Sequence, residues 1–154
     1  MSQHKAKIEW KGGTPDYRLG KYTREHTWHF DGGLAVAASA SPSVVPAPWS
    51  NPANVDPEEA FVASVSSCHM LTYLHEARRA GFQIDSYVDE AVGEMTKNEK
   101  GVPWISVVVL NPTIDYAGDK RPTHEQEAEL HHKAHEGCFI SQSVKTEVKV
   151  AGFA

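Results

Sequence analysis

The sequence predicts an α+β fold in which short strands surround a long helix. Four segments have strand-like patterns: residues 5–39 (several short strands), 83–96, 102–116 and 144–150. Two segments are helical: residues 57–80 and 123–137. This order of strands, helix, strands, helix and strand differs from strict βαβ alternation and indicates the α+β class. The 154 residues are enough for one core, so we expect a single domain over residues 1–154.

The N-terminal third predicts short strands and two loops. An Asp-Gly-Gly turn at residues 31–33 separates two apolar segments, which is typical of a hairpin. Residues 11–25 are rich in glycine and charge and are expected to form a loop. Residues 41–57 hold five of the nine prolines, so they should form an irregular surface loop that borders a site, with Trp49 near its entrance.

The first helix has clear start and stop signals. Asp56 is an N-cap acceptor, Pro57 suits the first helical position, and Glu59 completes a capping box. Gly81 is the expected C-terminal stop. Apolar and small residues cover almost all sides of residues 60–74, so we expect a core helix that is enclosed on most faces.

The second half predicts two long strands, a helix and a final strand. Residues 83–96 and 102–116 should pair as a hairpin across residues 97–101, and the β-branched run at 105–110 suggests burial on both faces. Thr123 and Gln126 form a second capping box, and the helix should end at Gly137. Alternation over residues 144–150 indicates a half-exposed strand.

Composition excludes several function classes. The formal net charge is -5, whereas a nucleic-acid partner would require a basic face. We find neither a membrane-spanning apolar run nor a signal-peptide pattern, so we expect a cytoplasmic protein without a membrane partner. A permanent disulfide is not expected in that compartment, which makes a redox or catalytic role for the two cysteines the central question.

The two cysteines stand in different local settings. Cys68 lies within the apolar helix, where burial raises the pKa of a thiol unless a cation lies beside it. By itself, Cys68 is best interpreted as a small core residue. Cys138 follows the end of the second helix, in the segment AHEGC at residues 134–138.

Both cysteine segments resemble motifs of the OsmC/Ohr family of thiol-dependent hydroperoxide reductases. Residues 56–69, DPEEAFVASVSSCH, resemble the family's helix with a cysteine ten residues after a glutamate. Residues 134–138, followed by Ser141, resemble its second-cysteine motif, and the order of elements agrees along essentially the whole chain. The resemblance implies antiparallel sheets packed around a long central helix, in an intertwined homodimer.

The resemblance also implies an activity and roles for individual residues. Cys68 would be the peroxidatic cysteine, Cys138 the resolving cysteine, and Glu58 the acidic partner of a catalytic arginine. Arg24 fits the position of that arginine better than Arg18. The substrate would be an organic hydroperoxide, with inorganic peroxides left open, and the reductant an external dithiol on a lipoyl or thioredoxin-like protein. No cofactor or metal is implied.

Two features depart from the family pattern, and two alternatives remain. Phe139 stands where many relatives have proline, and the first loop is longer, which affects the expected substrate preference more than the chemistry. His131, His132 and His135 with Cys138 could form a zinc site, although an exposed polar helix face is the favoured interpretation. The protein could also be a non-catalytic member of the same fold.

Overall fold

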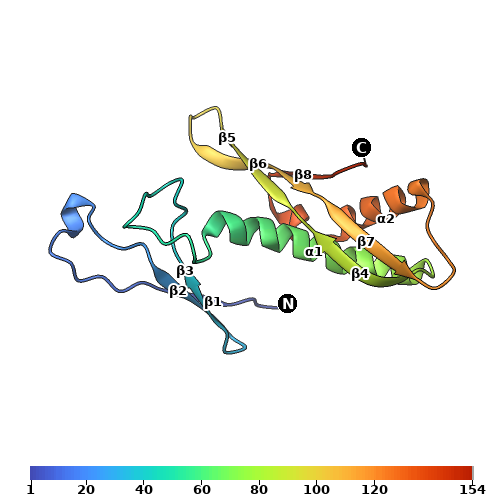
Figure 1. Ribbon diagram of the computed structural model, residues 1–154, viewed down its shortest axis with the longest axis horizontal. Coiled ribbons are helices and arrows are strands. Elements are labelled where there is room, and N and C mark those ends of the chain that lie inside the picture. Colours follow the sequence, from blue (N-terminus) through green and yellow to red (C-terminus); the bar gives the residue numbers. More distant parts are fainter. Residues whose placement is uncertain (154) are drawn as a thin grey trace. The chain divides into compact units, whose positions relative to one another are not determined.

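The computed structural model describes residues 1–153 and divides into two compact units, Met1–Ala60 and Phe61–Ala154. Two longer helices and eight strands follow the chain in the predicted order of strands, helix, strands, helix and strand. The α+β class is therefore confirmed (Figure 1).

The first unit contains a three-stranded antiparallel sheet in the order β1-β2-β3. Its strands are Ala6–Glu9, His26–Phe30 and Ala35–Ala38. The predicted hairpin turn is present, since the Phe30 amide donates to the Leu34 carbonyl at 2.9 Å. The long connection between β1 and β2 holds a short 3₁₀ helix, η1, at Tyr17–Leu19.

Helix α1, Pro57–Arg79, has the predicted N-terminal cap. The Glu59 amide donates to the Asp56 carboxylate at 2.8 Å, and the Asp56 amide donates to the Glu59 carboxylate at 3.2 Å. Gly81 ends the helix with a φ of 82°, a left-handed conformation that glycine adopts without strain.

The prediction that α1 is enclosed on most faces is wrong for the single chain. Its buried residues are Val65, His69, Tyr73 and Ala77, which recur every fourth position and form one stripe. Leu71, on another face, is 61% exposed. The apolar residues outside the stripe therefore lack full cover within this chain.

In the second unit, each of the two predicted long strands is observed as two shorter strands. The strands are β4 (Gln83–Asp89), β5 (Val92–Lys97), β6 (Pro103–Leu110) and β7 (Pro112–Ala117). Strands β5 and β6 form the predicted hairpin, whereas β4 pairs with β7 in a separate two-stranded sheet. The break between β6 and β7 falls at Asn111, whose amide donates to the Asp89 carboxylate at 2.6 Å instead of continuing the ladder. Pro112 follows and has no N–H to donate.

The last strand, β8, is Glu147–Val150 and is shorter than the predicted 144–150, because residues 144–146 form no strand; a short 3₁₀ helix, η2, precedes them at Ser141–Ser143. It pairs in parallel with β6, so this sheet is mixed rather than wholly antiparallel. In β6 only Val108 and Leu110 are fully buried. The expectation that residues 105–110 are buried on both faces is thus wrong, since one face stays partly exposed.

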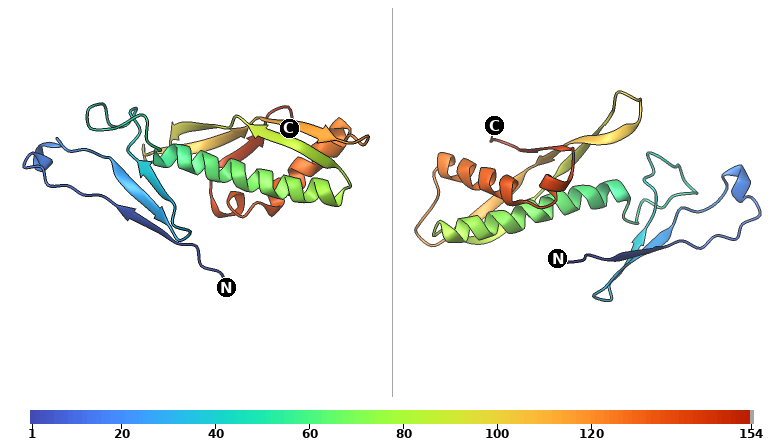
Figure 2. Two further views of the ribbon diagram at one scale, coloured as in Figure 1. Left: turned by 60° about the horizontal axis from the view of Figure 1, so that its bottom comes forward. Right: turned by 180° about the vertical axis from the view of Figure 1, so that it is seen from behind.

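Helix α2, His124–Gly137, has the predicted capping box between Thr123 and Gln126. Both views in Figure 2 show α1 and α2 on the same side of strands β4–β8. One core cluster joins α1 and α2 to β4 and β7 through Tyr73, Phe82 and Leu130. A second core cluster joins α1 to β6 through Val65, Val108 and Leu110, and Val148 and Val150 of β8 pack against it. These clusters fix the positions of the two helices that carry the cysteines.

Candidate functional site

The fold of the second unit brings Cys68 and Cys138 together. Cys68 lies midway along α1 and is partly exposed, whereas Cys138 is the C-cap residue of α2 and is fully buried. Both thiols are free, and the Cys138 side chain lies close enough to Cys68 to raise the pKa of its thiol. Seventy residues apart in the sequence, they form a pair that can exchange a proton or form a disulfide.

Gly137 allows this close approach between α1 and α2. A Cβ atom at Gly137 would lie 2.9 Å from Cγ2 of Thr72, a distance that real Cβ contacts avoid. Thr72 follows Cys68 by one helical turn, and its hydroxyl donates to the Cys68 carbonyl at 2.9 Å. Because Gly137 has no side chain, the end of α2 can lie against the turn of α1 that runs from Cys68 to Thr72.

Burial raises the pKa of the Cys68 thiol, and the hydrogen bond with Cys138 raises it further. The backbone amides of Ile140 and Phe139 act in the opposite direction and lower this pKa. The raising contributions dominate, so within this unit Cys68 favours the protonated thiol. An efficient nucleophile would need a further positive charge beside the sulfur.

Arg24 lies in the first unit and is held by its own loop. Its guanidinium Nη1 donates to the carbonyls of Gly20 and Tyr22, at 2.9 and 2.6 Å, and its Cζ lies 3.6 Å from the centre of the Tyr22 ring. The Arg24 amide also donates to the Trp49 carbonyl at 2.9 Å, so the proline-rich loop supports this segment. Arg24 lines a cavity of about 400 Å³ with Trp10, Tyr17 and Tyr22.

Arg18 and Glu58, also in the first unit, differ in their surroundings. Arg18 is exposed on η1, whereas Arg24 is partly buried, which favours Arg24 as the arginine of a site. Glu58 has a buried Oε2 atom without a hydrogen-bond partner. Within residues 1–153 no ion pair joins Arg24 to Glu58, so the predicted pair is not formed in the single chain.

His69 and His131 form a buried pair: His69 follows Cys68 directly on α1, and His131 lies on α2, about two turns before Cys138. Their side chains are 0% and 3% exposed, and His69 Nε2 lies 3.0 Å from His131 Nδ1. His131 also packs on Tyr73 and Phe153, with ring centres 4.4 and 4.8 Å away. His69 is thus a core histidine, whereas the expectation of an exposed histidine face on α2 is wrong for His131.

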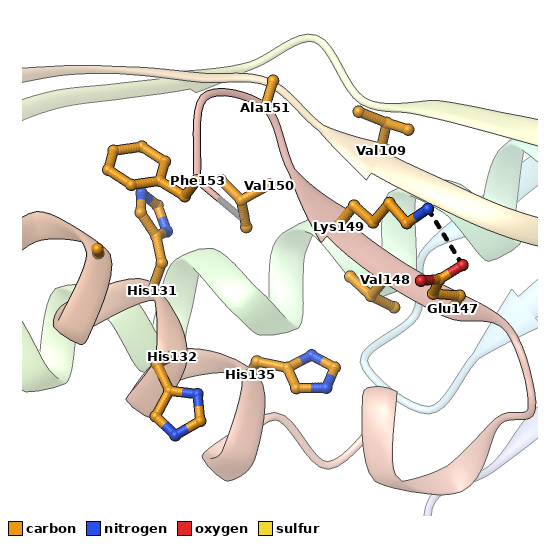
Figure 3. A pocket seen from close by; sticks show the side chains of 11 residues that line it. Val109, His131, His132, His135, Glu147, Val148, Lys149, Val150, Ala151 and Phe153 are labelled. Atoms are coloured by element: carbon orange, nitrogen blue, oxygen red, sulfur yellow. Dashed lines mark ion pairs between the residues drawn. The ribbon is translucent and has the colours of Figure 1, made fainter.

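A second cavity, of about 500 Å³, lies between α2 and β8 in the second unit. Figure 3 shows His132 and His135 extending from α2 on one side, with Val148 and Val150 on β8 opposite them. No group of three or more His, Cys, Asp or Glu side chains in the described part of the chain could hold a metal ion. The alternative of a zinc site formed by His131, His132, His135 and Cys138 is therefore not supported by the described residues.

Three features of the site escaped the sequence analysis. Tyr22 supports the Arg24 guanidinium, Gly137 lets the end of α2 approach α1, and the amides of residues 139–140 lower the pKa of Cys68. Only Gly137 carried a signal, as a helix end immediately before a cysteine. The acceptor of a backbone N–H and the cation on a partly buried aromatic ring such as Tyr22 leave no pattern in one sequence.

Comparisons with known proteins agree with this architecture. Residues 50–151 match the family model described as OsmC-like protein. An OsmC-like protein of unknown function from Vibrio cholerae is 50% identical, with 97% of this chain and 98% of that chain covered and a TM-score of 0.94. None of the curated proteins compared with this sequence matches it significantly.

More distant structures share the fold. The organic hydroperoxide resistance protein OhrB of Bacillus subtilis is 23% identical, with 95% and 96% of the two chains covered and a TM-score of 0.62. An organic hydroperoxide resistance protein OsmC from Legionella pneumophila is 16% identical, with 97% of each chain covered and a TM-score of 0.68. No helix within residues 1–153 is long and apolar enough to span a membrane. The family model matches residues 50–151, and the Vibrio cholerae protein that is 50% identical is also described as OsmC-like. The chain therefore belongs to the OsmC-like protein family.

Proposed function

We propose that this protein is a thiol-dependent peroxidase that reduces organic hydroperoxides with Cys68 and Cys138. The observation that carries the proposal is the pair of free thiols on two adjoining helices, where Gly137, next to Cys138, approaches Thr72, one turn after Cys68. Hydroperoxide resistance proteins among its structural neighbours support the same substrate class.

The reaction balances with these two residues and an external dithiol. The Cys68 thiolate attacks the terminal oxygen of the hydroperoxide, the O–O bond breaks, and protonation of the leaving oxygen releases an alcohol and leaves Cys68 as sulfenic acid. The Cys138 thiol then displaces water from that sulfenic acid and forms a disulfide, which protects Cys68 from further oxidation. A dithiol of lipoyl or thioredoxin-like type reduces the disulfide by exchange.

Arg24 and Glu58 have supporting roles in this proposal. The guanidinium of Arg24 would stabilise the Cys68 thiolate and align the peroxide, and Glu58 would orient the guanidinium through a bidentate ion pair. Burial raises the pKa of Cys68, and the Oε2 atom of Glu58 is buried without a hydrogen-bond partner, so a cation would stabilise both groups. Within its own loop the Arg24 guanidinium is held by two carbonyls and by the Tyr22 ring.

We also propose that residues 1–154 act as one OsmC-like domain in an intertwined homodimer. Leu71 on α1 is 61% exposed and the helix buries a single stripe, so a second copy would cover the remaining apolar residues. In such a dimer Arg24 and Glu58 of one chain would meet the cysteines of the other.

Steady-state peroxide consumption tests the proposed function. Cumene and tert-butyl hydroperoxide are compared with hydrogen peroxide, with dithiothreitol or dihydrolipoamide as reductant. We expect turnover of the organic peroxides and loss of both free thiols on adding about one equivalent of peroxide without reductant. Retention of both thiols under these conditions would favour a non-catalytic member of the family.

A further inference from the structure

We propose that the cavity between α2 and β8 binds a small uncharged molecule with a hydroxyl group on an apolar body, such as an alcohol or a phenol. The cavity lies within the second unit, and neither Cys68 nor Cys138 is among the described residues that line it. It is therefore separate from the cysteine pair, and the proposal does not depend on the proposed peroxidase function.

The size and the lining of the cavity suit a small organic molecule. Its volume of about 500 Å³ falls within the range of about 300–1,000 Å³ of small-molecule sites, which are mainly apolar with a few polar groups. Figure 3 shows the valines of β8 opposite the histidines of α2. The apolar lining residues are Val109, Ala128, Val148, Val150, Ala151 and Phe153. The body of a ligand would thus contact aliphatic and aromatic side chains.

Two histidine nitrogen atoms at the cavity have no hydrogen-bond partner within residues 1–153. They are His131 Nε2 and His135 Nδ1, one helical turn apart on α2, and both atoms are buried. His131 is 3% exposed, and its Nδ1 lies 3.0 Å from His69 Nε2. The His131 Nε2 atom is on the other side of the ring from that contact, so it is the nitrogen left for the cavity. A buried polar atom without a partner destabilises the fold, and a ligand that hydrogen-bonds to it would remove this penalty.

The charges at the cavity favour an uncharged ligand. Glu147 and Lys149 form an ion pair at 3.3 Å, which Figure 3 shows as a dashed line. Burial lowers the pKa of His131 to about 3, so its imidazole is neutral near pH 7. Lys149 is the only lysine or arginine among the described lining residues. An anionic ligand would therefore have to compete with Glu147 for Lys149.

A hydroxyl group matches the His69–His131 pair wherever the proton between the two rings lies. If His131 Nδ1 carries that proton, His131 Nε2 is an acceptor. If His69 Nε2 carries it, the proton of the His131 ring is on Nε2, which is then a donor. A hydroxyl both donates and accepts at one oxygen atom, so it can satisfy Nε2 in either case, whereas a carbonyl or an ammonium group would suit only one.

Benzyl alcohol is the test probe, and ethylbenzene, which has the same shape without the hydroxyl, is the matched comparison. Nitrogen-15 NMR of the histidine rings in the full chain follows each titration. Benzyl alcohol should shift the His131 Nε2 resonance until it saturates, and its ring protons should give nuclear Overhauser effects to the methyl groups of Val148 and Val150. Ethylbenzene should contact the same methyl groups and leave the Nε2 resonance unshifted. Benzoate should bind at least about tenfold more weakly than benzyl alcohol, because Lys149 is already paired.

Ala128→Leu blocks the cavity, and Lys133→Leu is its matched control. Ala128 lines the cavity, so the larger side chain should weaken benzyl alcohol binding about tenfold or more. Lys133 is exposed on α2 and does not line the cavity, so Lys133→Leu should keep the affinity. Circular dichroism checks that both variants are folded. If Ala128→Leu does not fold, the nuclear Overhauser effects in the unsubstituted protein decide the location of the probe.

Several results would overturn the proposal. The first is the absence of a saturable His131 Nε2 shift with benzyl alcohol, or an equal shift with ethylbenzene. Equal affinity in Ala128→Leu and the unsubstituted protein would place the probe outside the cavity. Benzoate binding as tight as that of benzyl alcohol would contradict the uncharged ligand. Resonances of the lining residues that change with protein concentration but not with benzyl alcohol would show that a second copy of the chain fills the cavity.

Discussion

The Nε2 atom of His69 lies 3.0 Å from the Nδ1 atom of His131, and both side chains are buried. Burial lowers the pKa of His69 to about 4, with a further decrease from His135, and lowers that of His131 to about 3, with a further decrease from His69. Both imidazoles are therefore neutral near pH 7, and one proton lies between the two facing nitrogens.

This pair predicts that stability falls on acidification. Between the ordinary pKa of 6.5 and the lowered values, the unfolded chain binds protons that the folded chain does not. The free energy of unfolding therefore rises with pH in this window, and lowering the pH from 7 to 5 should remove roughly 2 kcal/mol for each histidine. Urea unfolding at the two pH values measures the loss.

Replacing both histidines provides the control for this prediction. His69→Leu combined with His131→Leu removes both groups, so the decrease between pH 7 and pH 5 should become smaller by roughly 4 kcal/mol. An unchanged pH dependence in the double variant would assign the acid sensitivity to other groups.

The two cysteines should respond differently to serine substitution. Cys68→Ser should abolish peroxide reduction, because the nucleophile is lost. Cys138→Ser should react once and then overoxidise or depend on added thiol, because only two cysteines are present and no third thiol can resolve the sulfenic acid. Intact-protein mass spectrometry after peroxide should show loss of two hydrogens in the unsubstituted protein and added oxygen in Cys138→Ser. Full activity in Cys68→Ser would remove the basis of the mechanism.

Arg24 rather than Arg18 should support the thiolate. Arg24→Met should raise the pKa of Cys68 by more than about 1 and slow peroxide attack, since only a cation in contact with sulfur has so large an effect. Arg18→Met is the matched control, because Arg18 is exposed on η1. Ultraviolet absorbance of the thiolate against pH compares them. A larger effect at Arg18 would show that the wrong arginine has been assigned.

Gly137→Ala should separate the two cysteines. The added Cβ would meet Thr72 Cγ2 at 2.9 Å, so the end of α2 must move away from the Cys68 turn. Such overpacking destabilises by about 1–3 kcal/mol, and disulfide formation after peroxide should become slower while overoxidation of Cys68 increases. Glu136→Ala, at an exposed neighbouring position, is the control and should keep the rate of disulfide formation. Equal disulfide yields in the two variants would mean that α2 tolerates the methyl group.

Local signals in the sequence predicted the helices well and the strand pairing less well. The helix ends could be predicted because their signals act within one helical turn and need no tertiary contact. These signals are the N-cap residues Asp56 and Thr123 and the C-terminal Gly81. The division of the long strands near Asn111 depends on a contact with Asp89, 22 residues away, and the parallel pairing of β8 depends on the position of α2. The two cysteine motifs could be recognised in the sequence. The effects of Gly137 and of the amides of residues 139–140 could not, because they depend on α1 packing against the end of α2.

The spacing on α1 motivates the last prediction. Glu58 precedes Cys68 by ten residues, which corresponds to about 15 Å along a helix axis, too far for both to join one compact site within one chain. The proposed homodimer resolves this by placing Glu58 of one chain beside Cys68 of the other. The exposed Leu71 and the single buried stripe of α1 are consistent with a second copy on that helix.

Subunit exchange tests the shared site. Mixing inactive Cys68→Ser with weakly active Glu58→Ala should restore activity, because one of the two sites in each heterodimer then combines Glu58 from the first variant with Cys68 from the second. Mixing Cys68→Ser with Cys138→Ser is the matched control and should give no rescue, because both cysteines of a site come from the same chain. Exchange is confirmed by native mass spectrometry of subunits with different tags. A fully active monomer at nanomolar concentration would place Glu58 and Cys68 of each site in one chain. Proven exchange without rescue in the first mixture would mean the same, or that Glu58 is not part of the site.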